Sequence, residues 1–156
     1  MKDVIYLTGG ADMLDSIADL WEELNRHHGS ISRYFANYFA ARSFDERRNV
    51  FVEKAANGQL RVDVAHDSDT GIAIGYCISS INTDHVGEID SIYVASAYRS
   101  KGIGDVLIRK ALLWLDDNKV ELKTVNVLPE NERALAFYGR YGFFQRVMQL
   151  WQVRNR

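Results

Sequence analysis

The stretch from Val86 to Val127 reads as a strand, a glycine-bearing turn, a helix and a second strand, and it restricts the fold more than any other feature of the chain. The helix is indicated by apolar residues spaced four apart, which share one face: Ile103, Leu107, Ala111 and Leu115. The second strand is predicted over Lys123–Val127. Two strands joined through a helix in one sheet form a right-handed parallel crossover. We therefore expect a sheet with at least one parallel pair.

An antiparallel meander is predicted just before this crossover. Leu60–Val64 alternates apolar and polar residues, a turn follows, and Ile72–Ile81 reads as the second strand of a hairpin. The next strand completes the meander. Its apolar residues step by three between Ile89 and Ile92, whereas strict alternation would step by two. This step predicts a β-bulge near Ser91.

The first part of the chain predicts one short strand, Val4–Leu7, and then helices. The first helix is expected to start at an N-cap, Asp12, and to end before Gly29. The second is expected over residues 31–41, where aromatic side chains recur at spacings of three and four. Ser43–Glu46 is a capping-box pattern, which predicts the start of a third helix.

The last part predicts a helix and a strand. Asn131 is expected to cap a helix that runs to Tyr141, with Gly142 at its end, and Phe144–Val153 reads as the final strand. No glycine- or serine-rich linker interrupts the sequence, so residues 1–156 are expected to form a single domain. The predicted class is α/β (α+β): a mixed central sheet, an antiparallel N-terminal meander, a parallel strand–helix–strand crossover and flanking helices.

Composition excludes several classes of protein. The formal net charge is −2, which argues against nucleic acid as the main partner. Cys77 is the only cysteine, so neither a disulfide within the chain nor a cysteine-rich metal site is expected, and we expect Cys77 to be a core thiol. Residues 1–6 do not resemble a signal peptide, and no apolar stretch approaches the ~20 residues of a membrane helix. These features predict a cytoplasmic protein that needs no membrane and no metal.

Arg99–Gly104, with the sequence Arg-Ser-Lys-Gly-Ile-Gly, lies between a predicted strand and a predicted helix. Glycines let the backbone approach a ligand closely, and the start of a helix offers N–H groups and a positive dipole end to an anion. Arg99 and Lys101 add two cations. The segment lacks the spacing of a P-loop, and Leu107 stands where a dinucleotide fingerprint needs its third glycine. Taken alone, it is either a pyrophosphate cradle or an ordinary strand-to-helix turn.

A second motif favours the cradle. Residues 131–143 fit the pattern Asn-x-x-Ala-x-x-Phe-Tyr-x-x-x-Gly-Phe at every fixed position. Together with Arg99–Gly104, which fits Arg/Gln-x-x-Gly-x-Gly/Ala, this segment resembles the GNAT superfamily of acetyl-CoA-dependent N-acyltransferases. The resemblance covers residues 86–144, and before them it rests on the order of elements. Ser96 departs from a common proline and Ser100 from a common glycine.

The resemblance implies a binding site for acetyl-CoA as cosubstrate. The acetyl carbonyl and the pantetheine arm would bind the backbone of the strand end: Ile92, Tyr93 and Val94. The pyrophosphate would bind the turn: Arg99, Ser100, Lys101, Gly102, Ile103 and Gly104. Asn131 would contact pantetheine, serve as a plain N-cap, or do both. Tyr138 would protonate the departing thiolate, although a tyrosine there is otherwise an ordinary core residue.

Two carboxylates are candidates for the general base. Glu88 lies where some GNAT proteins carry a catalytic glutamate, and a carboxylate can accept the proton of an attacking amine directly or through water. Asp90 is two residues on, so it shares a face of the strand and is the alternative base or an acceptor-binding group. The competing interpretation of Glu88 is an exposed strand charge.

These features predict direct transfer of acetyl to a primary amine in a ternary complex. The strands carrying Glu88 and Asn126 are expected to part and admit the pantetheine arm. Part of the aromatic run Tyr34–Phe39 is expected to line the acceptor pocket. The acceptor is left open between a small-molecule amine and a protein amine, and a homodimer is also left open. The rival interpretation is an acyl-CoA-binding sensor or interaction module without catalysis.

Overall fold

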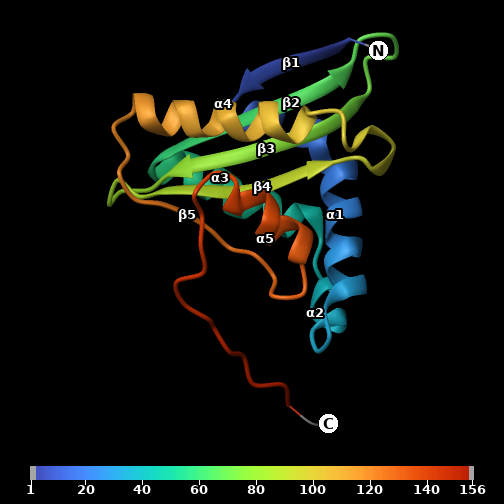
Figure 1. Ribbon diagram of the computed structural model, residues 1–156, viewed down its shortest axis with the longest axis vertical. Coiled ribbons are helices and arrows are strands. Elements are labelled where there is room, and N and C mark those ends of the chain that lie inside the picture. Colours follow the sequence, from blue (N-terminus) through green and yellow to red (C-terminus); the bar gives the residue numbers. More distant parts are fainter. Residues whose placement is uncertain (1–2, 155–156) are drawn as a thin grey trace.

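The structure is a computed structural model, and it describes residues 3–154. Its centre is a five-stranded sheet whose strands follow chain order (Figure 1). The first four strands are antiparallel and β5 is parallel to β4, which confirms the predicted mixed α/β sheet with its meander and crossover. The strands are β1 Val4–Gly9, β2 Gln59–Asp67, β3 Ala73–Ile81, β4 Gly87–Val94 and β5 Lys123–Val125.

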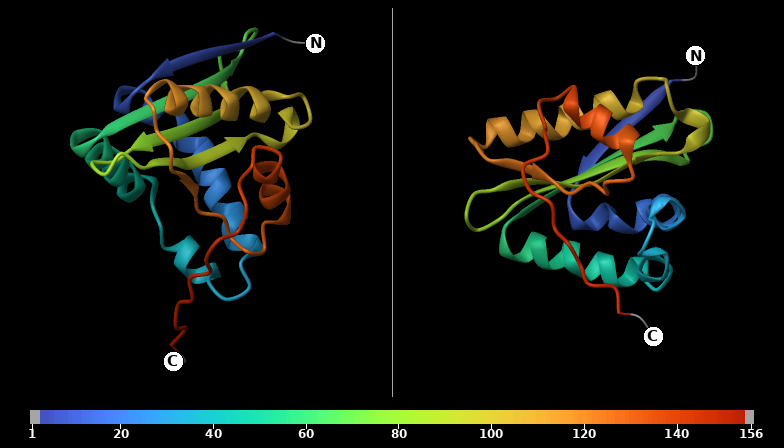
Figure 2. Two further views of the ribbon diagram at one scale, coloured as in Figure 1. Left: turned by 60° about the vertical axis from the view of Figure 1, so that its left-hand side comes forward. Right: turned by 60° about the horizontal axis from the view of Figure 1, so that its bottom comes forward.

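Helical segments cover both faces of this sheet (Figures 1 and 2). They are η1 Ala11–Ile17, α1 Ala18–Ile31, α2 Ala36–Ala40, α3 Phe44–Asn57, η2 Ser96–Tyr98, α4 Ile103–Asp117 and α5 Glu132–Gly139. Two of them begin at the caps that the sequence predicts. Ser43 Oγ accepts from Glu46 N at 3.2 Å at the start of α3, and Asn131 Oδ1 accepts from Ala134 N at 3.1 Å at the start of α5.

The sheet separates two apolar cores. One lies under α4 and α5, where the predicted helix face is fully buried and Tyr138 joins it: Ile103, Leu107, Ala111 and Leu115. The other lies under η1, α1 and α3, around Leu14, Ile17, Phe51 and Tyr76. Because alternate residues of a strand point to opposite faces, each central strand contributes to both cores. Cys77 faces the first core and is buried as predicted.

The predicted β-bulge is present in β4. Ile78 of β3 is paired with Ser91 and the next residue, Ser79, with Ile89, so Asp90 is left without an opposite residue. The extra residue turns both Asp90 and Ser91 to the face covered by α3. It also returns Ile92 to the face covered by α4, which explains the three-residue step.

Two predictions for the N-terminal helices are wrong in detail. The chain after Gly10 first forms a 3-10 helix, and Asp12 accepts a hydrogen bond from Gly10 N at 3.0 Å and caps no α-helix. The following helix α1 continues past Gly29 to Ile31. Residues 31–41 hold only the five-residue α2, because Ser32 is extended and its hydroxyl accepts from Phe35 N, which turns the chain.

The strand predicted over Phe144–Val153 is wrong. Within the described chain, residues 143–154 form neither strand nor helix, and the segment runs from α5 away from β5 (Figures 1 and 2). A strand needs a neighbouring ladder, and this path offers none. Its contact is aromatic: the ring of Trp151 lies 5.9 Å from Phe35 and 5.2 Å from Tyr38, edge to face. We call residues 144–154 the C-terminal segment.

Two further boundaries differ from expectation. β5 ends at Val125, so Asn126 and Val127 lie outside the sheet, and α5 ends at Gly139 with a turn leading to Gly142. The turn is closed by Phe143 N, which donates to Tyr138 O at 3.1 Å. None of the helices within residues 3–154 combines the length and the apolar character that crossing a membrane requires.

Candidate functional site

The turn between β4 and α4 has the backbone of an anion site. Ser100 and Gly102 both have positive φ, 63° and 80°, and Gly102 is the N-cap of α4. The first intrahelical bond of α4 runs from Val106 N to Gly102 O, so the N–H groups of residues 103–105 precede it. A Cβ on Gly102 would meet no atom within 4 Å. The glycine therefore faces open space in front of a helix N-terminus, an arrangement that suits a phosphate group.

The two cations of the turn face aromatic rings. Arg99 Nε donates to Val94 O at 3.0 Å, and its guanidinium lies 5.2 Å from the ring centre of Tyr93. Lys101 Nζ lies 5.4 Å from the ring centre of Tyr98. Arg99 thus braces the end of β4 through a hydrogen bond and a cation–π contact. Within residues 3–154, Arg99 is hydrogen-bonded to the strand, whereas the ammonium group of Lys101 is not.

Gly104, the last residue of the predicted cradle, has a packing role. A Cβ there would lie 3.6 Å from Phe137 Cε2, which is ordinary contact. The first turn of α4 therefore packs closely on α5, and Ile103 is buried beside it in the core under these two helices. Asp105 in the same turn is held by Arg140 Nη1 at 3.1 Å and by the hydroxyl of Tyr141.

The end of β4 presents one unpaired edge. Pairing between β4 and β5 stops at Ile89 and Val125, while β4 continues to Val94. Ala95 N donates to Ile74 O of the neighbouring strand β3. Because hydrogen bonds alternate in an antiparallel ladder, the backbone groups of Ile92 and Val94 point the other way, toward the side where β5 no longer pairs.

The side chain of Tyr93 lies on the opposite face of the sheet from the side chains of Ile92 and Val94. It packs with the core under α1 and α3, and its hydroxyl donates to Glu23 Oε2 at 3.2 Å. Tyr93 therefore ties α1 to the strand end. Its pKa is raised, first by burial and also by the charge of Glu23.

The two candidate bases meet at one lysine. Glu88 and Asp90 point to the face covered by α3, and the ammonium group of Lys54 from that helix donates to Glu88 Oε2 and to Asp90 Oδ1. Asn126 Nδ2 lies 3.3 Å from Glu88 Oε1, and Arg47 Nη2 lies 3.4 Å from Asp90 O. Residues of β4, of α3 and of the chain just after β5 thus meet in one charged cluster. We call Glu88 and Asp90 the acidic pair.

Burial separates the two carboxylates. The side chain of Glu88 is 25% exposed and that of Asp90 is fully buried. Burial and the neighbouring charge of Glu88 raise the pKa of Asp90 to about 6. Burial alone would also raise the pKa of Glu88, but hydrogen bonds and charge from Lys54 bring it below its usual value. A carboxylate with a pKa near neutrality is better matched to accept a proton at physiological pH.

Tyr138 and Asn131 lie on α5, on the other face of the sheet from the acidic pair. Tyr138 is 6% exposed and packs between Phe137 and Phe143, with ring centres 5.3 and 5.8 Å away. Burial raises the pKa of Tyr138 above its usual value, so the phenol keeps its proton. Asn131 uses its side chain as the N-cap of α5. The structure thus does not bring Tyr138 into contact with Glu88 or Asp90.

Sequence reasoning missed Lys54 and Arg47. A signal existed: the two residues are seven apart on a predicted helix, so they share a face, and two carboxylates share a face of a strand. What the sequence lacks is which helix face covers which strand.

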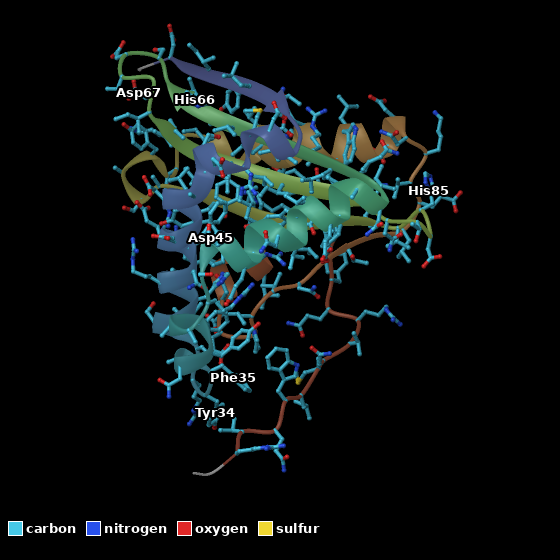
Figure 3. All side chains as sticks on the ribbon, turned by 180° about the vertical axis from the view of Figure 1, so that it is seen from behind. Tyr34, Phe35, Asp45, His66, Asp67 and His85 are labelled. Atoms are coloured by element: carbon cyan, nitrogen blue, oxygen red, sulfur yellow. The ribbon has the colours of Figure 1, made fainter. Side chains whose placement is uncertain are left out.

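A hollow on the surface lies between α1 and α2. Its volume is about 530 Å³, and it is lined by Trp21, Glu22, Asn25, Arg26, Gly29, Ala36, Phe39, Ala40 and Arg42. Phe39 belongs to the aromatic run that the sequence singled out, whereas Tyr34 and Phe35 lie at the far end of the molecule beside the C-terminal segment (Figure 3). Among residues 3–154, no three His, Cys, Asp or Glu side chains gather as a metal site would need.

Solved structures share this fold. A GCN5-related N-acetyltransferase from Ralstonia eutropha JMP134 superposes with a TM-score of 0.77 at 17% identity, over 97% of this chain and 99% of that one. An aminoglycoside N-acetyltransferase AAC(6')-Iy in complex with CoA gives 0.67 at 17% identity, over 100% of this chain and 97% of that one.

Sequence comparisons point the same way. The N-acetyltransferase YobR of Bacillus subtilis, described as uncharacterized, is 35% identical over 78 residues, which is 50% of this chain and 30% of that protein. The mycothiol acetyltransferase of Corynebacterium efficiens is 28% identical over 98 residues, 63% of this chain and 33% of that protein. The chain thus spans about a third of these relatives. The profile of the acetyltransferase (GNAT) family matches residues 14–143, and the chain therefore belongs to that family.

Proposed function

We propose that the protein transfers an acetyl group from acetyl-CoA to a primary amine by direct attack in a ternary complex. One observation carries this proposal: the unpaired edge of β4 leads straight into a turn with a left-handed glycine and an open helix N-terminus. A strand edge suits the amide groups of a pantetheine arm, and the helix start suits a pyrophosphate. Membership of the GNAT family supports the same assignment.

The backbone is the main binding surface in this proposal. Pantetheine and the acetyl carbonyl would take hydrogen bonds from Ile92 and Val94, whose backbone groups face away from β3. The pyrophosphate would take N–H groups of residues 101–104, with Lys101 as the nearby cation. Arg99 would act indirectly, because its guanidinium braces Val94 and Tyr93. Asn131 would contribute by fixing the start of α5.

The chemistry requires a proton acceptor and a proton donor. The amine nitrogen attacks the thioester carbon, the C–N bond forms, and the C–S bond breaks. The proton on nitrogen would go to the acidic pair, and the CoA thiolate would take the proton of Tyr138. Burial raises the pKa of the phenol, so Tyr138 keeps its proton until the thiolate forms, and burial would raise the proton affinity of a thiolate held against it in the same way.

The acceptor is proposed as a primary amine on a small molecule or a protein. The hollow between α1 and α2 is the candidate region for the acceptor; it combines the carboxylate of Glu22 and the aromatic rings of Trp21 and Phe39 with two cations, Arg26 and Arg42, so its charge does not select a cationic amine by itself. One protein of similar fold is an aminoglycoside N-acetyltransferase, and aminoglycosides are therefore one class of amine to include in a panel. A cytoplasmic location is part of the proposal.

A binding test comes first. Acetyl-CoA at about 100-fold above its dissociation constant should stabilise the folded protein by roughly 2.7 kcal/mol. A thermal-shift titration measures this stabilisation. The controls are buffer without acetyl-CoA and adenosine alone. A folded protein that shows no shift at millimolar acetyl-CoA would contradict the proposal.

A turnover test follows. The protein is incubated with acetyl-CoA and a panel of monoamines, polyamines, aminoglycosides and peptides with free amino groups, and released thiol is detected. Release that depends on one amine class supports the proposed transfer. Tight binding of acetyl-CoA without turnover of any amine would favour the sensor interpretation.

A further inference from the structure

Lys54 is hydrogen-bonded to both candidate bases, Glu88 and Asp90. It lies outside the two sequence motifs at residues 99–104 and 131–143. Its side chain is 31% exposed, and its ammonium group makes two charge-assisted hydrogen bonds, one to each carboxylate. Burial lowers the pKa of Lys54, but the two carboxylates more than offset that effect, so its net pKa is raised and it stays charged. A permanent cation therefore sits between the two groups that compete for the role of base.

The three charges have unequal freedom to react. Both oxygens of Glu88 have partners, Lys54 on one and Asn126 on the other. Asp90 uses Oδ1 for Lys54, and its Oδ2 is buried without a hydrogen-bond partner among the described residues. An unpaired buried carboxylate oxygen is costly, and a proton or a bound water relieves it. Among the described residues, Asp90 Oδ2 is thus the oxygen of the two carboxylates without a hydrogen bond, with the Ser80 hydroxyl of β3 close by, whereas each Glu88 oxygen already accepts one.

The bulge in β4 fixes this geometry. Asp90 is the extra residue of the strand, so its backbone leaves the ladder and its carbonyl oxygen is free to accept from Arg47 Nη2 at 3.4 Å. Arg47 and Lys54 approach from the same face of α3, seven residues apart. The helix therefore holds Asp90 at both its backbone and its side chain, and holds Glu88 through the same ammonium group.

We propose that Lys54 is a positioning residue of the acetyl-transfer site, which clamps Glu88 so that Asp90, directly or through a water, accepts the proton of the attacking amine. This inference rests on the proposed function. The proton leaves the amine nitrogen as the C–N bond forms, and it goes to Asp90 Oδ2. Lys54 exchanges no proton and touches no substrate in this scheme. Glu88 keeps its negative charge, which makes Asp90 a stronger base.

The surroundings allow the charge effects to be separated. Arg47 and Lys54 face the acidic pair from α3, Glu88 and Asp90 face each other on β4, and Tyr76 of β3 faces Arg47. Removing the Lys54 cation should raise the pKa of both carboxylates, because an opposite charge at contact distance lowers a carboxyl pKa by about 1–3 units. The base must be ionised to work, so the acid limb of the pH–rate profile should move to higher pH.

The test compares three variants in the full chain. Lys54→Met removes the charge and Lys54→Arg keeps it. Arg48→Met is the matched control, because Arg48 lies on the same helix as Lys54 and its ion pair with Asp15 is on the surface. The profile of kcat/KM against pH is measured with the best amine of the panel. We expect the acid limb to rise by about one to three pH units in Lys54→Met, and to stay in place in Lys54→Arg and Arg48→Met.

A second measurement needs no turnover. Carboxyl carbon shifts of Asp90 and Glu88 are followed by NMR as a function of pH, in wild type and in Lys54→Met without ligand, and assignment uses Asp90→Asn. We expect both titrations to move upward in Lys54→Met. If that variant does not fold, Lys54→Gln takes its place, and Glu88→Gln adds a second check, because loss of the Glu88 charge should move the Asp90 titration downward.

The outcomes are distinct. Unchanged carboxyl titrations in Lys54→Met overturn the inference whether or not the enzyme is active. Moved titrations with an unmoved acid limb overturn the role of Asp90 as proton acceptor. If wild type acetylates no amine, the proposed function fails, and with it the part of Lys54 in transfer, whatever the titrations show. The inference is supported if both the carboxyl titrations and the acid limb move to higher pH in Lys54→Met, while Lys54→Arg keeps the wild-type acid limb.

Discussion

The side chains of Asp90 and Ser91 lie on the same face of β4, although the two residues are consecutive in the chain. Asp90 reaches Lys54 on α3, and Ser91 Oγ lies 2.7 Å from Tyr76 Oη in the core under α1 and α3. In a regular strand, one of the two would face α4. The bulge therefore places a buried carboxylate and a buried hydroxyl pair side by side.

The bond between Tyr76 and Ser91 should stabilise the bulge. Tyr76 is fully buried, so Tyr76→Phe leaves the Ser91 hydroxyl without this partner and should lower the free energy of unfolding by about 1 kcal/mol. Ser91→Ala and the double variant complete a cycle, measured by urea unfolding. We expect a coupling free energy of about 0.5–1.5 kcal/mol. Strict additivity would show that the two hydroxyl groups do not interact.

Gly102→Val should weaken CoA binding more than it destabilises the fold. The substitution places a β-branched side chain at φ 80° and in the open space before α4. Gly71→Val is the matched control, because Gly71 also has a positive φ, 70°, and no atom within 4 Å of a Cβ, but lies in the β2–β3 turn. Calorimetry should show weaker CoA binding for Gly102→Val alone. Equal affinities in the two variants would move the phosphate site elsewhere.

Tyr138→Phe should lower turnover and leave CoA affinity nearly unchanged. The variant keeps the ring that packs on Phe137 and Phe143 and removes only the proposed donor. Loss of a positioned proton-transfer group costs about 10²- to 10⁴-fold in rate. Single-turnover kinetics with the best amine and calorimetry with CoA measure the two effects. Full turnover with chemistry shown to be rate-limiting would remove Tyr138 from the mechanism.

His28 should make the fold sensitive to acid. Burial, and then the charges of His27 and Arg42, lower the pKa of His28 to about 4. The unfolded chain therefore takes up this proton at higher pH than the folded one, and stability should fall as pH drops from about 6.5 to 4. We expect His28→Gln to reduce this loss by on the order of 1 kcal/mol, and His85→Gln, at an exposed position in the turn between β3 and β4, to leave it unchanged. The measurement is urea unfolding at pH 7.5 and pH 4.5. An equal loss of the free energy of unfolding between these pH values in wild type and both variants would contradict the assignment.

Core and C-terminal segment should respond differently to the same substitution. Leu107 lies on the inner face of α4 and is fully buried, whereas Leu150 is 83% exposed. Leu107→Ala should lower the free energy of unfolding by about 2–5 kcal/mol. Leu150→Ala should change it by less than about 0.5 kcal/mol. A large loss from Leu150→Ala would mean that the segment packs on the domain in solution.

The sequence predicts the sheet and most of the helices because their signals are local. Alternation identifies β2, the turn after it marks the start of β3, four-residue spacing identifies α4, and Ser43 and Asn131 mark helix starts through their own side chains. The C-terminal segment shows the limit. Phe144–Val153 has strand-like residues, but pairing depends on whether a ladder lies along its path, and that is a property of the whole fold.

The candidate site divides in the same way. The cradle can be read from residues 99–104 because glycines and a helix start are adjacent in the chain. The acidic pair can be read from its spacing of two. The contact with Lys54 joins residues 34 and 36 positions apart, and no local pattern encodes it. The roles of Glu88, Asp90 and Tyr138 therefore stay predictions that the variants above can test.

The left-handed residues of the cradle have a consequence for ligand affinity. Ser100 and Gly102 hold positive φ as part of the fold, and for Ser100 this conformation costs roughly 1–2 kcal/mol. The turn has thus given up its conformational entropy during folding, and an incoming anion need not order it again. Preorganisation of this kind links affinity to the fold itself. A substitution that lets the turn relax can weaken binding without removing a single contact.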